Sequence, residues 1–266
     1  MEILNPRTRH TATGKRVVAV FLLAVAGIIF AGEARNKIFA ARAEAEFHRA
    51  QIQLQSNTND FAAAWHFARA CYDFADFATN DTERATLAVQ GIAASRQLLA
   101  YRSKSAPGHY YLGMNLGQLA RTEILGALKL VREMEREFKT ANDLDEHFDY
   151  AGPARCLGLL YRDAPGWPTS IGSRYKAREW LERAAKLAPD YPENRLNLIE
   201  SRLKWNDRTS AESELKTLDS LWPKAQTNFV GEAWERSWAD WATRKNAAEQ
   251  SLAQPPPPAE SPKNHR

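Results

Sequence analysis

The chain has 266 residues, of which 44% are hydrophobic, and its formal net charge is +4. This length and composition are those of a folded chain with one or two domains. The charge belongs to the ends: residues 1–16 carry +3 and residues 253–266 carry +1, so the span 33–252 is neutral. A neutral folded part lacks the basic surface that nucleic-acid binding requires, and we expect no nucleic-acid partner.

An uncharged apolar segment, residues 17–32 (VVAVFLLAVAGIIFAG), follows the basic tail of residues 1–16. As a helix it would be about 24 Å long, close to the ~30 Å hydrocarbon core of a bilayer. It predicts a single transmembrane signal anchor, and a cleaved secretory signal peptide is the alternative. Because the basic residues come first, residues 1–16 should stay in the cytoplasm. We therefore expect a single-pass protein of the bacterial inner membrane with a periplasmic C-terminal domain.

Helical composition continues beyond the anchor. Residues 33–57 contain no Gly or Pro and predict a helical stalk, after which residues 58–252 form the repeat domain. The first hairpin begins with AAAWHFARACY, in which Trp65, Ala68 and Tyr72 share one helix face, and returns over residues 83–102. The second opens with YYLG at residues 110–113 and returns over residues 123–141.

The third and fourth hairpins, residues 157–194 and 192–223, reveal a repeat. Four positions recur after 34 residues: Ala177, Leu181, Ala184 and Pro189 correspond to Ala211, Leu215, Leu218 and Pro223. A period of 34 residues with small residues where paired helices meet is typical of the tetratricopeptide (TPR) repeat. The sequence therefore predicts an all-α fold: a TPR-like α-solenoid of about four helical hairpins, preceded by the transmembrane helix.

A last helix, over residues 228–252, should close the solenoid. Its apolar face would carry four residues, Val230, Trp234, Trp238 and Trp241. A cap that buries the end of the final repeat is the expected role, and a ligand cage of tryptophans is the alternative. The segment 253–266 is Pro-rich and predicts a disordered tail, with a docking motif for proline-binding domains as the other interpretation.

Signatures of catalysis and metal binding are missing from the sequence. The TGKR segment at residues 13–16 lacks the glycines of a phosphate loop, and the six histidines include no HExxH motif. Cys71 and Cys156 fall two repeats apart, so we expect buried thiols rather than a disulfide. We expect a protein that is not an enzyme and that has no catalytic residues, metal or cofactor.

Binding is the function that a TPR stack offers, because its first helices line a concave face. By register, the candidate binding residues on that face are His66, Asp73, Tyr110, Met114, Arg155 and Arg162. Their mixed chemistry suits a peptide or an organic anion. A loop insertion, APGWPTSIGS, adds Trp167 in a Gly–Trp–Pro turn, which either folds back onto its own hairpin or closes the mouth of the concave face.

The segments WHFARACY, GHYYLGMNLG and LGLLYRDAPGWPTSIGS together resemble bacterial TPR proteins related to the T component of TRAP transporters, over about residues 60–223. The resemblance implies a periplasmic lipoprotein that pairs with a solute-binding protein and forms a pore-containing oligomer. This chain differs in having no lipobox cysteine and in its predicted anchor. Two functions follow: an anchored scaffold for a protein or peptide partner, or an accessory solute-binding component of a TRAP-type transport system.

Overall fold

The computed structural model describes residues 36–57, 60–123 and 126–255. The predicted anchor at residues 17–32 lies outside these ranges, and so does almost all of the Pro-rich tail. Within the described ranges no helix is long and apolar enough to cross a bilayer. The contacts divide the chain into two compact units, residues 1–46 and 47–266.

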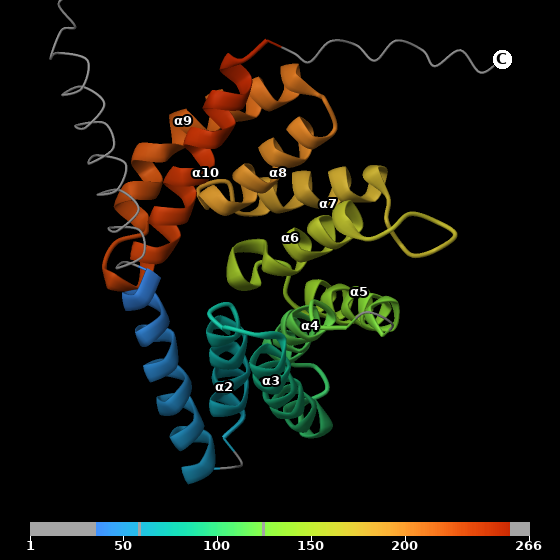
Figure 1. Ribbon diagram of the computed structural model, residues 1–266, viewed down its shortest axis with the longest axis vertical. Coiled ribbons are helices and arrows are strands. Elements are labelled where there is room, and N and C mark those ends of the chain that lie inside the picture. The colour runs from blue at the N-terminus through green and yellow to red at the C-terminus, as the bar shows by residue number, and fades with distance from the viewer. Residues whose placement is uncertain (1–35, 58–59, 124–125, 256–266) are drawn as a thin grey trace, which may run out of the picture. The chain divides into compact units, whose positions relative to one another are not determined.

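The larger unit contains four consecutive helical hairpins and a final helix (Figure 1). The first helices of the hairpins are α2 (Phe61–Ala75), α4 (Ala106–Ala120), α6 (Phe148–Asp163) and α8 (Pro192–Lys204). The second helices are α3 (Asp81–Tyr101), α5 (Ala127–Leu144), α7 (Arg174–Leu187) and α9 (Arg208–Asn228). A short 3-10 helix, η1 (Glu232–Trp234), then leads into α10 (Glu235–Ala253).

Side-chain caps mark where several of these helices begin. The Asp60 carboxylate accepts hydrogen bonds from the backbone N–H groups of Ala62 and Ala63, at 2.8 and 3.1 Å. Asn80 and Ser173 cap α3 and α7 in the same way. Each cap satisfies N–H groups that have no partner inside the helix, so the starts of these helices are encoded locally.

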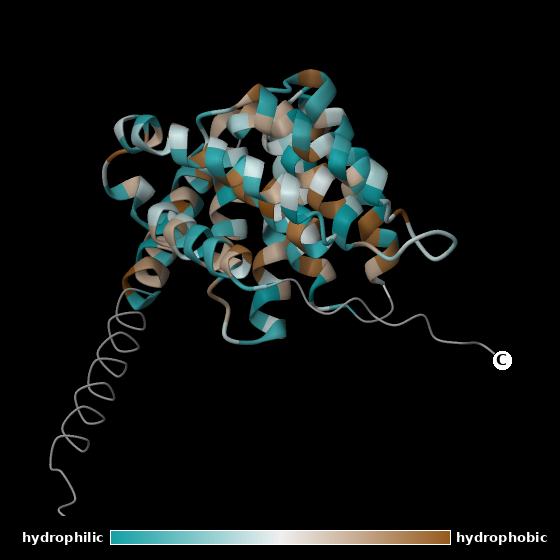
Figure 2. Cartoon of the chain, turned by 90° about the horizontal axis from the view of Figure 1, so that it is seen from above, coloured by the Kyte–Doolittle hydropathy of each residue, from teal (hydrophilic) through white to brown (hydrophobic). Residues whose placement is uncertain are grey.

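Helix packing follows the order of the chain. Each helix of α2–α9 packs against the next, and the first helices of neighbouring hairpins also meet, as α2–α4, α4–α6 and α6–α8. Hydrophobic and hydrophilic residues are interspersed along the helices (Figure 2). These contacts confirm the predicted all-α solenoid.

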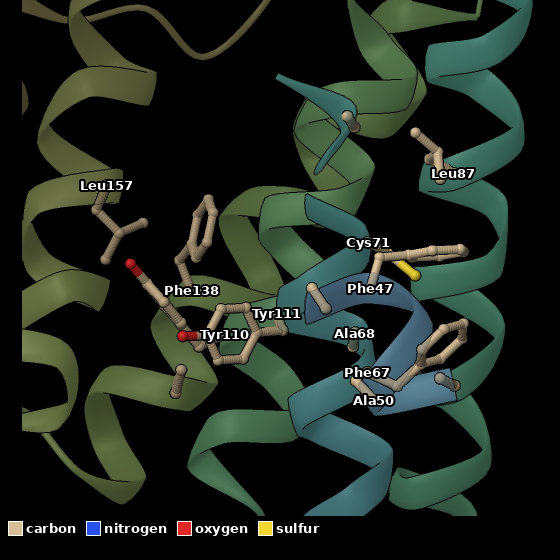
Figure 3. Packing of buried hydrophobic residues seen from close by; sticks show 14 of the residues in the cluster. Phe47, Ala50, Phe67, Ala68, Cys71, Leu87, Tyr110, Tyr111, Phe138 and Leu157 are labelled. Atoms are coloured by element: carbon tan, nitrogen blue, oxygen red, sulfur yellow. The ribbon is translucent and has the colours of Figure 1, made fainter. Parts of the chain in front are cut away.

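The principal core consists of buried residues between the helices of the first three hairpins (Figure 3). Tyr110 packs against Phe138 with ring centroids 6.1 Å apart, and Phe47 packs against Phe67 at 5.5 Å. Phe47 and Ala50 are buried although they precede residue 58, where the sequence places the start of the repeat domain. Residues 36–56 are helical, and the part of this helix from Phe47 onward belongs to the larger unit.

The two helices of the third hairpin, α6 and α7, approach each other closely, as expected of a TPR unit. A Cβ atom added to Gly158 of α6 would lie 2.6 Å from Cγ of Leu181 on α7. Of the positions that recur after 34 residues, those buried on α7 and α9 are Ala177, Leu181, Ala184, Ala211 and Leu218. The 34-residue period thus records equivalent packing positions in consecutive hairpins.

The end of the fourth hairpin differs from the prediction. Pro223 lies inside α9, which continues to Asn228, whereas Pro189 follows the end of α7. The predicted helix 228–252 is also interrupted, because Gly231 adopts φ of +91°, a conformation that a helix does not contain. Val230 is consequently 65% exposed, and Phe229 is buried in its place.

The tryptophans of the final segment form core. Trp241 is 1% exposed, and its ring lies 5.4 Å from Tyr191 and 5.0 Å from Trp238. Together with Trp234 they cover Leu196 and neighbouring residues of the last hairpin. α10 therefore caps the solenoid, as the sequence predicts.

Candidate partner-binding groove

Two adjoining cavities open along α2, α4 and α6. A polar cavity has a volume of about 450 Å³ and an apolar cavity one of about 320 Å³. They share five lining residues, Tyr72, Asp76, Met114, Cys156 and Leu159. We call the two cavities together the groove. Because it is lined mainly by first helices of hairpins, it lies where the repeat register predicts the binding face.

The apolar cavity is shaped by flexible side chains. Met114 of α4 and Met134 of α5 lie beside Leu159 and Leu160 of α6. Unbranched, polarisable thioethers adapt to guests of different shape, so this cavity suits an apolar side chain. Cys156 also lines the cavity as a free thiol, and burial raises its pKa to about 11. The thiol therefore remains protonated at neutral pH.

The polar cavity contains a carboxylate placed by unusual backbone. Asp149, Tyr150 and Ala151 have φ values of 49°, 55° and 63°, a left-handed turn built from three residues other than glycine. Such a turn costs energy and persists where surrounding contacts hold it. Here Oδ2 of Asp149 accepts hydrogen bonds from the Tyr110 hydroxyl at 2.7 Å and from Nη2 of Arg155 at 2.8 Å.

Arg155 is held by partners on several elements. Its Nη1 donates to Oδ1 of Asn194 at 3.0 Å and to the carbonyl oxygens of Asp149 and Tyr150, both at 3.3 Å. Its guanidinium group also lies 5.2 Å from the centroid of the Tyr191 ring. The side chain is only 9% exposed. Arg155 therefore lines the polar cavity as part of its wall, with its charge balanced by Asp149.

The structure brings four of the predicted binding residues together. They line the polar cavity from α2, α4 and α6: Asp73, Tyr110, Met114 and Arg155. Burial raises the pKa of Asp73, and the guanidinium groups of Arg69 and Arg236 oppose this effect. Burial also raises the pKa of the Tyr110 hydroxyl well above its usual value. Tyr110 is therefore a hydrogen-bond donor at neutral pH.

Three predicted residues lie outside the groove lining. His66 is exposed and stacks on Trp65, with ring centroids 3.7 Å apart. Arg162 pairs with Asp163 at 2.7 Å and donates to the Ser201 hydroxyl at 3.2 Å. Trp167 is 88% exposed in the loop between α6 and α7, so it does not fold back onto its hairpin. It lines neither cavity.

The polar cavity also contains charged residues that sequence reasoning missed. Arg69 and Asp76 share a helix face with Asp73, at spacings of four and three residues, so the helix register could have identified them. Glu193 lies in the first turn of α8 and could have been found in the same way. Arg236 and Asp240 could not, because they reach the groove from α10 and no local pattern reports where that helix lies.

Among the described residues, no group of three His, Cys, Asp or Glu side chains is arranged to hold a metal ion. Cys71 and Cys156 are both free thiols. The contacts described above are hydrogen bonds, ion pairs and apolar packing within the chain.

Comparison with solved structures identifies the class of the fold. The thermophilic TPR protein TTC0263 of Thermus thermophilus superposes with a TM-score of 0.56 and 19% sequence identity, covering 79% of this chain and 92% of that one. Yeast Tom70 aligns over 79% of this chain and 59% of its own, with 12% identity and a TM-score of 0.30. No family model and no curated protein matches the chain. The fold is thus that of TPR proteins.

Proposed function

We propose that this protein is a non-enzymatic TPR scaffold, anchored in the bacterial inner membrane by residues 17–32, that binds a protein or peptide partner on its concave face in the periplasm. The observation that carries the proposal is the groove, in which a polar and an apolar cavity adjoin along α2, α4 and α6. Volumes of about 450 and 320 Å³ are large enough to hold side chains of an extended segment.

Peptide binding is favoured over solute binding because two arginine side chains that could bind an organic acid are already paired within the chain. Arg155 and Arg162 are the residues that would receive the carboxylate of an organic acid. Each is paired with a carboxylate of this chain, Arg155 with Asp149 and Arg162 with Asp163. A solute would have to displace these partners, whereas a peptide can use the open cavities beside them. A periplasmic solute-binding protein remains among the partners that the proposal includes.

Site-specific photo-crosslinking in intact cells tests the proposal. A photoreactive phenylalanine analogue at Leu159, in the floor of the groove, should give an adduct with one defined protein. The same analogue at Tyr175, 78% exposed on α7 away from the groove, is the control and should give none. Equal adducts from both positions, or none from Leu159, would contradict binding in the groove.

The anchor is tested by cell fractionation. The full chain should stay with the membrane after carbonate extraction, and a variant without residues 1–32 should be soluble. A protease added to spheroplasts should digest the repeat domain of the full chain. Protection from that protease would place the domain in the cytoplasm and overturn the periplasmic part of the proposal.

A further inference from the structure

The last helix contacts the first hairpin across the edge of the groove. Nη2 of Arg236, in the first turn of α10, lies 3.0 Å from Oδ2 of Asp76, which is 160 positions earlier and follows the last residue of α2. The guanidinium carbon of Arg236 lies 4.5 Å from the centroid of the Phe77 ring. Arg236 and Asp76 both line the polar cavity, so this contact stands at the groove itself.

The contact is a complete site for a basic side chain. Oδ1 of the Asp76 carboxylate accepts a hydrogen bond from Nε2 of Gln118 at 2.7 Å and lies 3.5 Å from Nη1 of Arg121, so Oδ2 is the oxygen that Arg236 occupies. The Phe77 ring supplies an aromatic face. A carboxylate and an aromatic ring side by side bind a guanidinium or ammonium group by charge-assisted hydrogen bonding and by cation–π attraction. Asp73, one turn earlier on α2, adds a second carboxylate to the same cavity.

Arg236 holds this site weakly. Its side chain is 46% exposed, and exposed ion pairs contribute little to stability. The firm contacts of α10 are farther along the helix, where Nε1 of Trp241 donates to Glu193 at 2.9 Å and Nε of Arg244 donates to Glu200 at 2.6 Å. The Arg236 side chain can therefore leave Asp76 while α10 keeps its place on the last hairpin.

We propose that the site formed by Asp76 and Phe77 receives an arginine or lysine side chain of the partner, and that Arg236 is the internal competitor for it. The adjoining apolar cavity then takes an apolar side chain of the same segment, because the two cavities share Met114 and Leu159. The partner segment thus carries a basic residue close to an apolar one. This inference rests on the proposed function and specifies the chemistry of its partner.

The chain offers a matched control for Arg236. Arg183 on α7 is also 46% exposed, pairs with Glu146 at 2.5 Å, and lies 5.4 Å from the centroid of the Trp180 ring. It has the same two kinds of contact but lines neither cavity of the groove. If the loss of any exposed arginine altered the peptide affinity, Arg183→Ala and Arg236→Ala would both show the altered affinity.

The test uses the full chain in detergent and a panel of fluorescent peptides in which an Arg–Leu pair occupies successive positions of a Gly/Ser background. Affinity is measured by fluorescence anisotropy. Arg236→Ala should bind the best peptide roughly two- to fivefold more tightly than the unaltered protein, because Arg236 no longer competes for Oδ2 of Asp76, while Arg121 keeps its place 3.5 Å from Oδ1. Arg183→Ala should bind it as the unaltered protein does. Replacing the peptide arginine by glutamate should abolish binding.

Asp76→Asn breaks the ion pair with Arg236, as Arg236→Ala does, but it also removes the carboxylate that would bind the peptide arginine. The two variants therefore separate loss of the binding carboxylate from loss of the competing arginine. We expect it to lose the arginine peptide. Tighter binding by Asp76→Asn, or unchanged binding by Arg236→Ala, would overturn the inference. Equal binding of the arginine and glutamate peptides would overturn it too, but would leave the scaffold function intact, which the Leu159 crosslink tests separately. Failure of every peptide to bind even Arg236→Ala would also reject it.

Discussion

Arg155 joins three helices of the solenoid through one guanidinium group. It contacts Tyr110 of α4, Asp149 of α6 and Asn194 of α8, and its side chain is 9% exposed. Removing one partner of a buried ion pair leaves the other charge without compensation, which costs more than the pair contributes. The residue that the sequence offers as a ligand contact is thus also a support of the groove wall.

We expect Arg155→Met to lower the free energy of unfolding by about 3–5 kcal/mol, because the Asp149 carboxylate and the Asn194 amide lose their partner. Urea unfolding followed by circular dichroism measures the change. Arg183→Ala, which breaks an exposed pair, should cost less than about 1 kcal/mol. If the two variants lost equal stability, Arg155 would not support the wall.

A second residue-scale feature gives the fold a pH dependence. Nδ1 of His109 lies 2.6 Å from Oε2 of Glu137, and Nε2 lies 2.9 Å from the carbonyl oxygen of Ser103. The hydrogen bond with Glu137 raises the pKa of His109 above its usual 6.5. Because the folded pKa exceeds the unfolded one, this contribution to stability is complete below pH 6.5 and is lost as the pH rises through the folded pKa.

His109→Gln should therefore reduce the loss of stability that accompanies a rise from about pH 5.5 to about pH 8.5. The free energy of unfolding in urea is measured at both pH values. His66→Gln is the control, because burial and Arg69 lower the pKa of His66 and its contribution has the opposite sign. An unaltered pH dependence in His109→Gln would contradict the assignment.

At the scale of elements, the contact between α6 and α7 depends on Gly158. An added Cβ would meet Cγ of Leu181 at 2.6 Å and the Leu181 backbone nitrogen at 3.1 Å, so the helices would have to move apart. In α4, a Cβ on Gly117 would meet only the flexible side chain of Met134, whose terminal carbon lies at 3.1 Å and can turn away. Gly158 thus faces a side chain and backbone that cannot move away, whereas Gly117 faces a side chain that can.

We predict that Gly158→Ala destabilises the protein by about 1–3 kcal/mol, because overpacking exceeds the gain in helix propensity. Gly117→Ala should be neutral or stabilising by up to about 1 kcal/mol. Thermal unfolding of both variants provides the comparison. Equal effects would show that backbone propensity, rather than the approach of α6 to α7, decides the outcome at residue 158.

The elements also show where local patterns are informative. α7 was predictable because Ala177, Leu181 and Ala184 follow a helical period and recur in α9. The start of α6 was not, since its left-handed turn at Asp149 is held by Tyr110 and Arg155 rather than by the residues of the turn itself. Local sequence reports helical faces, but it does not report strain that distant contacts maintain.

At the scale of the whole molecule, the groove is assembled from parts far apart in the chain. α2, α4 and α6 form its floor, α8 contributes Glu193, and α10 contributes Arg236. The first hairpin and the last helix meet because each hairpin is rotated slightly relative to the one before it. The packing of the helices sets the size of this rotation. The ion pair of Arg236 with Asp76 links the two ends of this arrangement.

The all-α repeat and the helix face that carries Asp73, Tyr110 and Met114 could be predicted from the sequence, because helical period and small-residue positions are local properties that each hairpin repeats. The pairing of Arg155 inside the groove wall, the position of Trp167 outside the groove and the contact of Arg236 with Asp76 could not be predicted in this way. Those outcomes depend on distances between residues of different hairpins, and packing geometry, rather than any local pattern, sets such distances.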